Sequence, residues 1–335
     1  MTLPLSRFLR GLVLLAAAAL AGSALTGTAL AQGGAATYPN KPVKIIVGYG
    51  AGGTGDVTMR ILAQKLSERM GQQFVIENRP GAGGVVATQM VQQAAPDGYT
   101  LVFIATGNFA MTPALFKSLP FDPVKDFEMV SLAGNFGFTI LVNGNSKINS
   151  VKDLIAEARA NPGKMNIGTV AVGTAQYLSA EWFKSMAGIQ ATTVPFKTSG
   201  DVVTALRSGE IQVGVETIAP VIGSVKSGAL KAIAVTENQR FPALPNVPTV
   251  AESGLTGYEV SGWNGLAAPA RTPRDIIDKL NREIGAALAD AELQKKFIDL
   301  GIVAKGNTPE QMQALLRKDI GLWREVVEKA KLEKQ

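Results

Sequence analysis

The sequence predicts an α/β protein, because short runs of β-forming residues alternate with amphipathic helical runs along most of the chain. An apolar strand-like run, 43–47, leads into the glycine-rich turn 48–56 and then into an amphipathic helix. The length that follows the first thirty or so residues suits about two domains. No linker separates them in sequence, as expected when the chain crosses between domains more than once and leaves a cleft.

The first part of the chain predicts strands that alternate with helices. A helix over 56–70 carries an apolar stripe, and Gly71 ends it. A second helix, 83–95, stops at the turn tripeptide 96–98. A long apolar extended segment, 131–142, leads into the polar turn 143–146. The strands expected before that segment cover 43–47, 74–77 and 100–104.

The second part of the chain repeats this alternation. Ser150 is placed to cap a helix over 151–160 through its side-chain oxygen. The Pro-rich segment 241–248 predicts a rigid loop, because apolar residues interleave with its prolines. The remaining strands are expected over 165–168, 191–195, 213–215, 231–235 and 258–268, and the remaining helices over 176–187, 201–208, 273–290 and 308–330.

Residues 1–31 have the pattern of a secretory signal peptide. Arg7 and Arg10 form a basic segment, 11–25 is apolar, and 29–31 (Ala-Leu-Ala) fits the small-x-small cleavage rule. The alternative is a membrane anchor, but the apolar stretch is short and rich in small residues. We expect cleavage after Ala31, which leaves Gln32 as the new N-terminus of an exported protein.

The composition contains neither histidine nor cysteine. That excludes a Ser-His-Asp triad, histidine-ligated zinc and thiolate chemistry. An enzyme would depend on carboxylates, lysine or tyrosine, and nothing else in the sequence points to one. We therefore expect no catalytic residue, no metal and no cofactor. The 33 basic and 27 acidic residues are scattered, so nucleic acid is not an expected partner.

The glycine run 48–56 has the geometry of an anion site, because a strand, a glycine-rich turn and a helix N-terminus present free backbone N–H groups. Its spacing also satisfies the G-x-G-x-x-G dinucleotide fingerprint, with Glu77 near the position of a ribose-binding acid. A fingerprint alone is weak, and exported proteins rarely meet nicotinamide cofactors. No Gly-Lys-Ser/Thr follows, which excludes a Walker P-loop.

The favoured interpretation is a carboxylate cradle made by the amides of Gly52, Gly53 and Thr54. Asp56 has two candidate roles. It either caps the helix and stabilises its positive end, which we favour, or accepts a hydrogen bond from the ligand.

Several motifs along the chain resemble one known family. They are YPNKP (38–42), GYGAGGTGD (48–56), ENRPGAGG (77–84), APDGYTL (95–101), LPFDPVKD (119–126), ANPGK (160–164), FKSMAG (183–188), ALPNVPTVAE (243–252) and NTPE (307–310). Together they resemble the Bug family, the TctC-like solute-binding receptors of tripartite tricarboxylate transporters. The resemblance covers essentially the whole chain after the signal peptide.

The resemblance implies a two-domain periplasmic-binding-protein fold of the Venus-flytrap, type II-like kind, with a ligand cleft between the domains. Domain 1 would comprise 38–139 plus 264–335, and domain 2 would comprise 140–263. It further implies a cofactor-free, monomeric protein in the periplasm. Its partners would be a small carboxylate ligand and the integral membrane subunits of a tripartite transporter.

The resemblance also implies a set of ligand-binding residues drawn from both domains. The family's first-domain loop usually reads Pro-Phe-x-Pro-Gly-Gly-x-x-Asp, and this chain matches its tail but has Gly48, Gly50 and Ala51 in place of its prolines. The expected set is Tyr49, Gly52, Gly53, Thr54, Asp56, Asn108, Gly173, Thr174, Ala175, Phe196, Glu216 and Thr217.

Two positions depart from the pattern of many relatives. Tyr177 stands where these carry histidine, and Glu216-Thr217 stands where they carry Asp-Asn. The longer Glu216 either shrinks the pocket and demands a donor on the ligand, or pairs with a nearby lysine. Asn108 and Trp263 are cleft or hinge candidates, with domain packing an equal alternative for Trp263.

We therefore expect a passive receptor that captures an organic acid in its cleft and delivers it to a membrane transporter. The first alternative is a secreted enzyme that uses Asp56 and Glu216 as a carboxylate pair, and the second is a component of a signalling receptor. The acid itself stays open, because backbone amides recognise a carboxylate and not what is attached to it. Di- and tricarboxylates, aromatic acids, acidic amino acids and nicotinate-like acids all fit.

Overall fold

The structure, a computed structural model, describes residues 37–52, 54–170, 174–329 and 334. The predicted signal peptide and its cleavage site therefore lie outside the described residues. Every helix and strand given below belongs to one compact unit, Pro39–Gln335. Among the described residues, no helix is both long enough and apolar enough to cross a membrane.

Within the described residues, the strands form one ten-stranded mixed sheet with the order β2-β1-β3-β9-β4-β7-β5-β6, in which β8 and β10 also pair with β4. β1, β2 and β3 are parallel to one another, and so are β5, β6 and β7. The strands are β1 (Val43–Val47), β2 (Phe74–Asn78), β3 (Thr100–Ala105), β4 (Phe127–Asn143), β5 (Met165–Val170), β6 (Ala191–Phe196), β7 (Val213–Thr217), β8 (Leu230–Val235), β9 (Ser261–Pro269) and β10 (Val303–Ala304).

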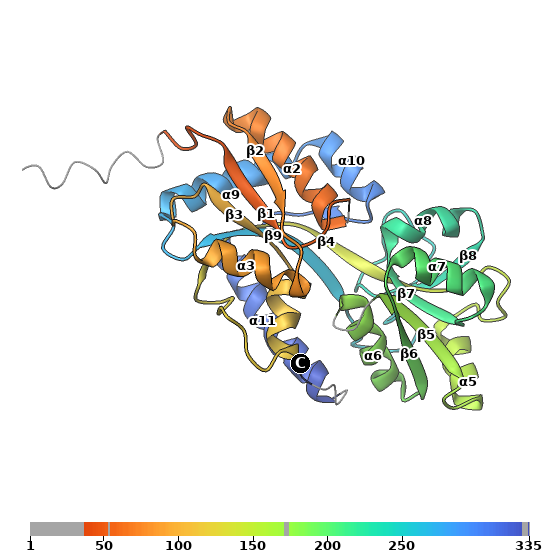
Figure 1. The fold of residues 1–335 in the computed structure, drawn as a ribbon. Coiled ribbons are helices and arrows are strands. Elements are labelled where there is room, and N and C mark those ends of the chain that lie inside the picture. The colour runs from red at the N-terminus through yellow and green to blue at the C-terminus, as the bar shows by residue number, and fades with distance from the viewer. Residues whose placement is uncertain (1–36, 53, 171–173, 330–333, 335) are drawn as a thin grey trace, which may run out of the picture. The chain divides into compact units, whose positions relative to one another are not determined.

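Helices follow most of these strands along the chain (Figure 1). They are α2 (Thr54–Met70), η1 (Ala82–Gly84), α3 (Val85–Gln92), η2 (Thr106–Met111), α4 (Thr112–Leu115), α5 (Val151–Ala160), α6 (Ala175–Ala187), α7 (Ser199–Ser208), α8 (Ile218–Lys226), α9 (Arg274–Leu288), α10 (Ala291–Asp299) and α11 (Pro309–Lys329). Their buried faces pack onto the sheet, as the amphipathic pattern predicts.

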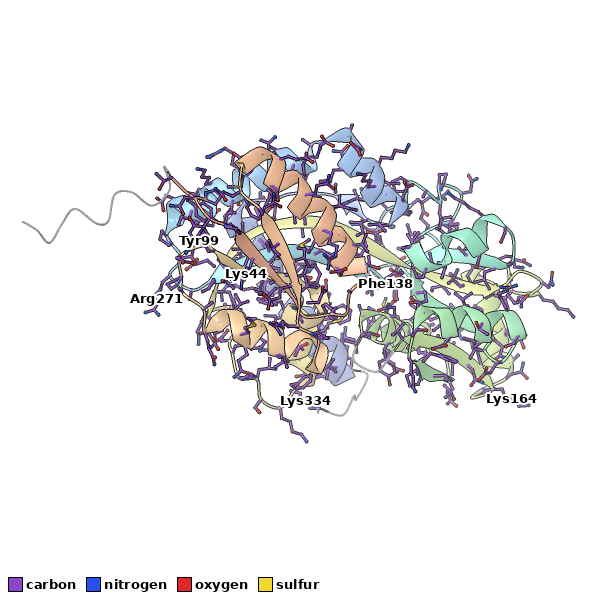
Figure 2. The ribbon with its side chains drawn as sticks, turned by 45° about the horizontal axis from the view of Figure 1, so that its top comes forward. Lys44, Tyr99, Phe138, Lys164, Arg271 and Lys334 are labelled. Carbon is purple, nitrogen blue, oxygen red and sulfur yellow. The ribbon has the colours of Figure 1, made fainter. Side chains whose placement is uncertain are left out.

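Strand β4 is shared by two groups of strands. Its first part pairs with β9 as far as Gly137, and from Phe138 onward it pairs with β7, while β8 joins it from Thr139. Phe138, labelled in Figure 2, is fully buried at this change of partner, whereas the labelled Lys44 and Lys164 are exposed. We call β1, β2, β3 and β9 the first group and β5, β6, β7 and β8 the second group.

Thr236 joins the strands at this change of partner. Its fully buried hydroxyl accepts a hydrogen bond from the N–H of Phe138 at 2.9 Å and donates one to the carbonyl of Val260 at 2.6 Å. Its own N–H donates to the Phe138 carbonyl at 3.0 Å. One side chain thus satisfies two buried backbone groups where the regular ladder is interrupted.

The expected elements are present, with shifted bounds. Ser150 caps α5 as predicted, because its hydroxyl oxygen accepts the N–H of Asp153 at 3.1 Å. The helix expected over 83–95 begins only at Val85, because Gly83 and Gly84 are left-handed. Sequence reasoning missed η2, α4, α8, α10 and β10. Helix α8 is hard to recognise from the sequence, because Gly223 lies in its middle and Pro220, which is tolerated in the first turn of a helix, also occurs in loops.

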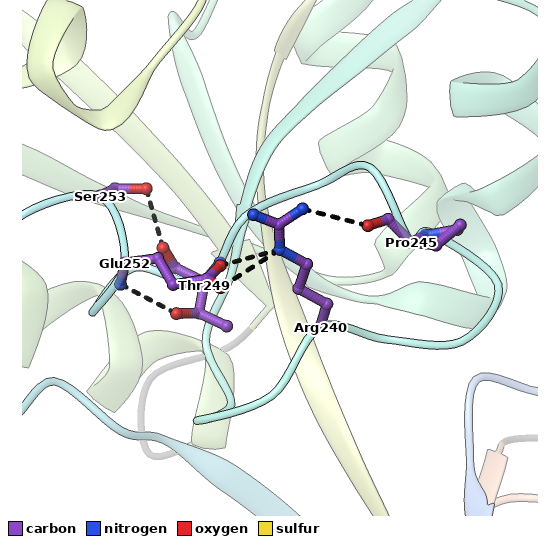
Figure 3. A network of polar contacts seen from close by, with 5 residues as sticks. All are labelled: Arg240, Pro245, Thr249, Glu252 and Ser253. Atoms are coloured by element: carbon purple, nitrogen blue, oxygen red, sulfur yellow. Dashed lines mark hydrogen bonds and ion pairs between the residues drawn. The ribbon is translucent and has the colours of Figure 1, made fainter.

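The Pro-rich segment 241–248 is held by buried apolar side chains and by hydrogen bonds of Arg240, as expected for the rigid loop that its interleaved apolar residues predict. Phe241 and Leu244 are buried in a small apolar cluster. Arg240 spans the loop (Figure 3): its guanidinium donates to the Glu252 carboxylate at 3.0 Å and to the Pro245 carbonyl at 3.3 Å.

Replacing Thr236 with valine tests the joint at Phe138. Valine has nearly the same shape but leaves a buried N–H and a buried carbonyl unsatisfied, which costs about 1–3 kcal/mol each. We expect Thr236→Val to lower the free energy of urea unfolding clearly more than Thr236→Ser, which keeps the hydroxyl. Equal losses in the two variants would show that the hydroxyl contributes nothing.

Candidate functional site

The segments that follow β1, β2 and β3 meet at one edge of the sheet, because the carboxyl ends of parallel strands share an edge. The contact is close enough to require glycine. A Cβ atom on Gly48 would lie 2.7 Å from the Cα of Gly84, which is itself left-handed. We call this place the first edge.

Asp56 is the polar centre of the first edge. It lies in the first turn of α2 and is almost fully buried. Its Oδ2 accepts the N–H of Gly52 at 2.8 Å and the Nε–H of Arg60 at 3.0 Å, and its Oδ1 accepts the amide of Asn78 at 2.9 Å. Although burial acts to raise it, hydrogen bonds from Arg60, Gly52 and Asn78 hold the pKa of Asp56 below its ordinary value.

Asp56 therefore acts within the chain. Its carboxylate stabilises the start of α2 and orders the loop before it, which is the capping type of role. The N–H of Gly52 is engaged by that carboxylate. Of the predicted cradle, Thr54 begins α2, and Gly53 lies outside the described residues.

Tyr49 and Asn108 lie together at the same edge. The Tyr49 hydroxyl is 3.5 Å from the Gly83 carbonyl, and its ring meets Phe103 edge-on at 6.0 Å. Burial raises the pKa of Tyr49 to about 12, and a hydrogen bond from the backbone of Asn108 partly offsets this. The Asn108 side chain is buried and holds the turn after β3, because it accepts the Ala105 N–H at 2.7 Å and donates to the Phe103 carbonyl at 3.1 Å.

A second edge forms where β5, β6 and β7 end and α6, α7 and α8 begin. Thr174 caps α6, since its hydroxyl oxygen accepts the N–H of Tyr177 at 3.3 Å, and Ala175 is the first residue of that helix. Phe196 ends β6 and packs against an apolar cluster. Gly173, the remaining predicted residue of this loop, lies outside the described residues.

Glu216 is fully buried at the second edge, near the end of β7. Its Oε2 accepts the hydroxyl of Ser199 at 3.0 Å and the N–H of Thr217 at 3.1 Å. In the described part of the chain, its Oε1 has no hydrogen-bond partner, and no lysine or arginine contributes to the shift of its pKa. Burial raises the pKa of Glu216 to about 7, and the hydrogen bonds from Ser199 and Thr217, with a smaller effect of the Gln176 side chain, partly offset this.

The other candidates have structural contacts. Trp263 is buried, its N–H donates to Thr106, and its ring Nε1–H donates to Asp319 at 2.7 Å, so it packs within the fold. Tyr177 is partly buried, and both burial and the charge of Glu181 raise its pKa.

The structure thus brings the predicted residues together in two sets. Tyr49, Gly52, Thr54, Asp56 and Asn108 gather at the first edge, and the second edge holds Thr174, Ala175, Phe196, Glu216 and Thr217.

Sequence reasoning missed three residues that hold these sets in place: Arg60, Asn78 and Gln176. Ser199, which also does so, lies in the segment 196–200 that the family resemblance implies as a wall of the cleft. Arg60 could have been found, because it lies one helical turn after Asp56.

Comparison with known proteins places the chain in a family. The model of the tripartite tricarboxylate transporter family receptor, TctC, matches residues 58–332. The protein BugT of Bordetella pertussis (strain Tohama I) is 34% identical over 292 residues, which cover 87% of this chain and 90% of that protein. The chain belongs to the TctC family.

Solved structures give the same result. A structure described as R. palustris Rpa4515 with adipate matches with a TM-score of 0.80 and 32% identity, over 89% of this chain and all (100%) of that chain. The periplasmic binding protein BugD matches with a TM-score of 0.77 and 33% identity, over 89% and 100%. The fold and the family together define a solute-binding receptor with a periplasmic-binding-protein fold.

The close contact of Gly48 predicts different effects for two neighbouring glycines. Gly48→Ala forces a Cβ against the backbone of Gly84 and should cost about 1–3 kcal/mol of unfolding free energy. At Gly50 a Cβ meets nothing within 4 Å, so Gly50→Ala should be neutral or stabilise by about 0.4–1 kcal/mol. Urea unfolding measures both, and equal effects would contradict the packing of the loop.

The buried carboxyl of Glu216 predicts a pH dependence. The folded state holds this proton up to about pH 7, whereas the unfolded chain releases it near 4.5. Ionisation is thus penalised in the folded state, so the free energy of unfolding falls as pH rises from 4.5 to 7, by roughly 3 kcal/mol in total. Urea unfolding between pH 5 and 8 should show this decline for the wild type relative to Glu216→Gln, and parallel curves would refute it.

Proposed function

We propose that the protein is exported, captures a small organic acid in a cleft between two domains, and delivers it to the integral membrane subunits of a tripartite transporter. Membership of the TctC receptor family supports the delivery step. The similar structure with adipate, an organic acid, supports a carboxylate ligand. Export would use the signal peptide 1–31, with cleavage after Ala31 and release of a monomer into the periplasm.

The two edges are the observation that carries the ligand proposal. Ligands of open α/β sheets bind outside the carboxyl ends of the strands, where helix N-termini offer N–H groups and a positive dipole end. The first edge has the start of α2, and the second has the starts of α6, α7 and α8. In the proposal these edges face each other across the cleft.

The domains would be 38–139 plus 264–335 and 140–263. The change of partner along β4 at Phe138 supports a division there, because a strand that changes neighbours is a natural hinge. Closure would bring both edges onto the ligand, and the bound acid would then stabilise the closed form.

In this proposal the backbone of the β1–α2 loop binds the ligand carboxylate. The N–H groups of Gly53 and Thr54 at the start of α2 would donate to it, while Asp56 holds the loop in shape. The remaining proposed ligand contacts are Tyr49, Gly52, Asn108, Gly173, Thr174, Ala175, Phe196, Glu216 and Thr217.

Binding without chemistry is favoured over the alternative of a carboxylate-pair enzyme. Both oxygens of Asp56 already accept hydrogen bonds from within the chain, so they are poorly placed to attack a substrate or take up its proton. A role as a signalling receptor component would use the same binding site and differ only in the downstream partner.

The Thr54 amide gives a test with a matched control. Thr54 is the first residue of α2, a position at which proline is tolerated, so Thr54→Pro removes one N–H and preserves the helix. A panel of mono-, di- and tricarboxylates should first identify acids that raise the melting temperature. For such an acid we expect Thr54→Pro to weaken affinity about 10- to 100-fold, the range for a hydrogen bond to a charged group.

Thr54→Ala keeps the N–H and should bind like the wild type in isothermal titration calorimetry. Equal affinity of the two Thr54 variants would remove this amide from the site. Chromatography of the incubated acid should show it unchanged, and steady conversion into a product would overturn the receptor proposal in favour of an enzyme.

A further inference from the structure

The two edges differ in how their buried carboxylates are compensated. At the first edge the charge of Asp56 is met by the guanidinium of Arg60, with 3.0 Å between Oδ1 and Nη2. At the second edge no cationic side chain of the described residues pairs with Glu216. Its hydrogen bonds come from the Ser199 hydroxyl and the Thr217 N–H, both to Oε2, and the Gln176 side chain lies near enough to lower its pKa slightly. None of these three side chains carries a charge.

Three helix starts converge on the Glu216 carboxyl. Gln176 lies in the first turn of α6, Ser199 begins α7, and Thr217 directly precedes α8. These helix ends would otherwise suit an anion, because their dipoles point positive ends at this place. A carboxylate of the chain itself already occupies the place that a ligand anion would take.

Oε1 is the part of Glu216 that still lacks a partner. The side chain is fully buried, and no described residue donates to this oxygen. A buried acceptor without a donor is costly, and a charged one more so. A ligand that brings a donor to this side of the site would remove that cost, whereas a second anion would be repelled.

We propose that Glu216 selects an acid that carries an ammonium group at the second edge, in preference to an acid with a second carboxylate there. The inference rests on the proposed function, because it assumes that the ligand lies between the two edges. It names the ligand class: a zwitterionic amino acid whose carboxylate lies on the β1–α2 loop. The preference arises from charge, because the carboxylate of Glu216 is buried and a buried charge acts on its neighbours over several ångströms.

Length-matched acids test the proposal by calorimetry at pH 8. The pairs are succinate and 3-aminopropanoate, glutarate and 4-aminobutanoate, and adipate and 5-aminopentanoate. In the pair that best fits the site, we expect the amino acid to bind about 10- to 100-fold more tightly than the diacid. Glu216→Gln should abolish or reverse this preference, because it removes the charge and keeps the shape.

Glu237→Gln is the matched control. Glu237 is also a largely buried carboxyl whose pKa burial raises to about 7, with the charge of Glu259 adding to the effect, but it follows β8 and its side chain lies against Gly137. This variant should keep the wild-type preference. Circular dichroism and melting temperature without ligand would show that both variants are folded.

The possible outcomes distinguish a failure of the proposed role of Glu216 from a failure of the proposed receptor function. Tighter binding of the diacid in every pair, or an unchanged preference in folded Glu216→Gln, would overturn the inference and leave a carboxylate receptor. Failure of every mono-, di- and tricarboxylate to bind would overturn the proposed function, and the inference with it.

Discussion

The backbone hydrogen bonds of β4 are the interaction on which the rest of the structure depends. This one strand, Phe127–Asn143, pairs with β9 along its first part and with β7 and β8 along its last part, so both groups of strands are built on it. A strand can exchange partners only where the interrupted ladder is otherwise satisfied. Thr236 does this at Phe138, and Gly137 leaves space for the Glu237 side chain, which a Cβ would meet at 2.6 Å.

Both edges follow from the parallel pairing on either side of β4. Because parallel strands end at a common edge, loops far apart in sequence come into contact there. The glycine run therefore meets the turn after β2 and the start of η2, and Gly48 allows the close contact with Gly84. A buried charge at such an edge needs hydrogen-bond donors. The carboxylate of Asp56, beside the start of α2, accepts hydrogen bonds from Gly52, Arg60 and Asn78.

The receptor family is defined by fold and sequence, but the chemistry of one receptor depends on a few buried groups. The carboxylate of Asp56 pairs with the guanidinium of Arg60, which offsets its negative charge, and it organises the loop before α2. Glu216 has no cationic partner among the described residues, and its Oε1 lacks a hydrogen bond, which is the basis of the charge preference that we propose for the second edge. The structure with adipate belongs to a protein 32% identical to this chain, a level at which the fold is shared while individual side chains differ.

The sequence by itself determined the α/β class, most strands and helices, the cap at Ser150 and the family, because these depend on local periodicity, turn residues and ordered motifs. It also identified Asp56 and Glu216 as candidate residues of the binding site. Only the tertiary structure decided their partners. Asn78 and Ser199 reach them from other elements, and no local pattern states which distant side chains will meet. Helix α8 likewise forms despite Gly223 in its middle, because packing of Ile218 and Val221 outweighs local propensity.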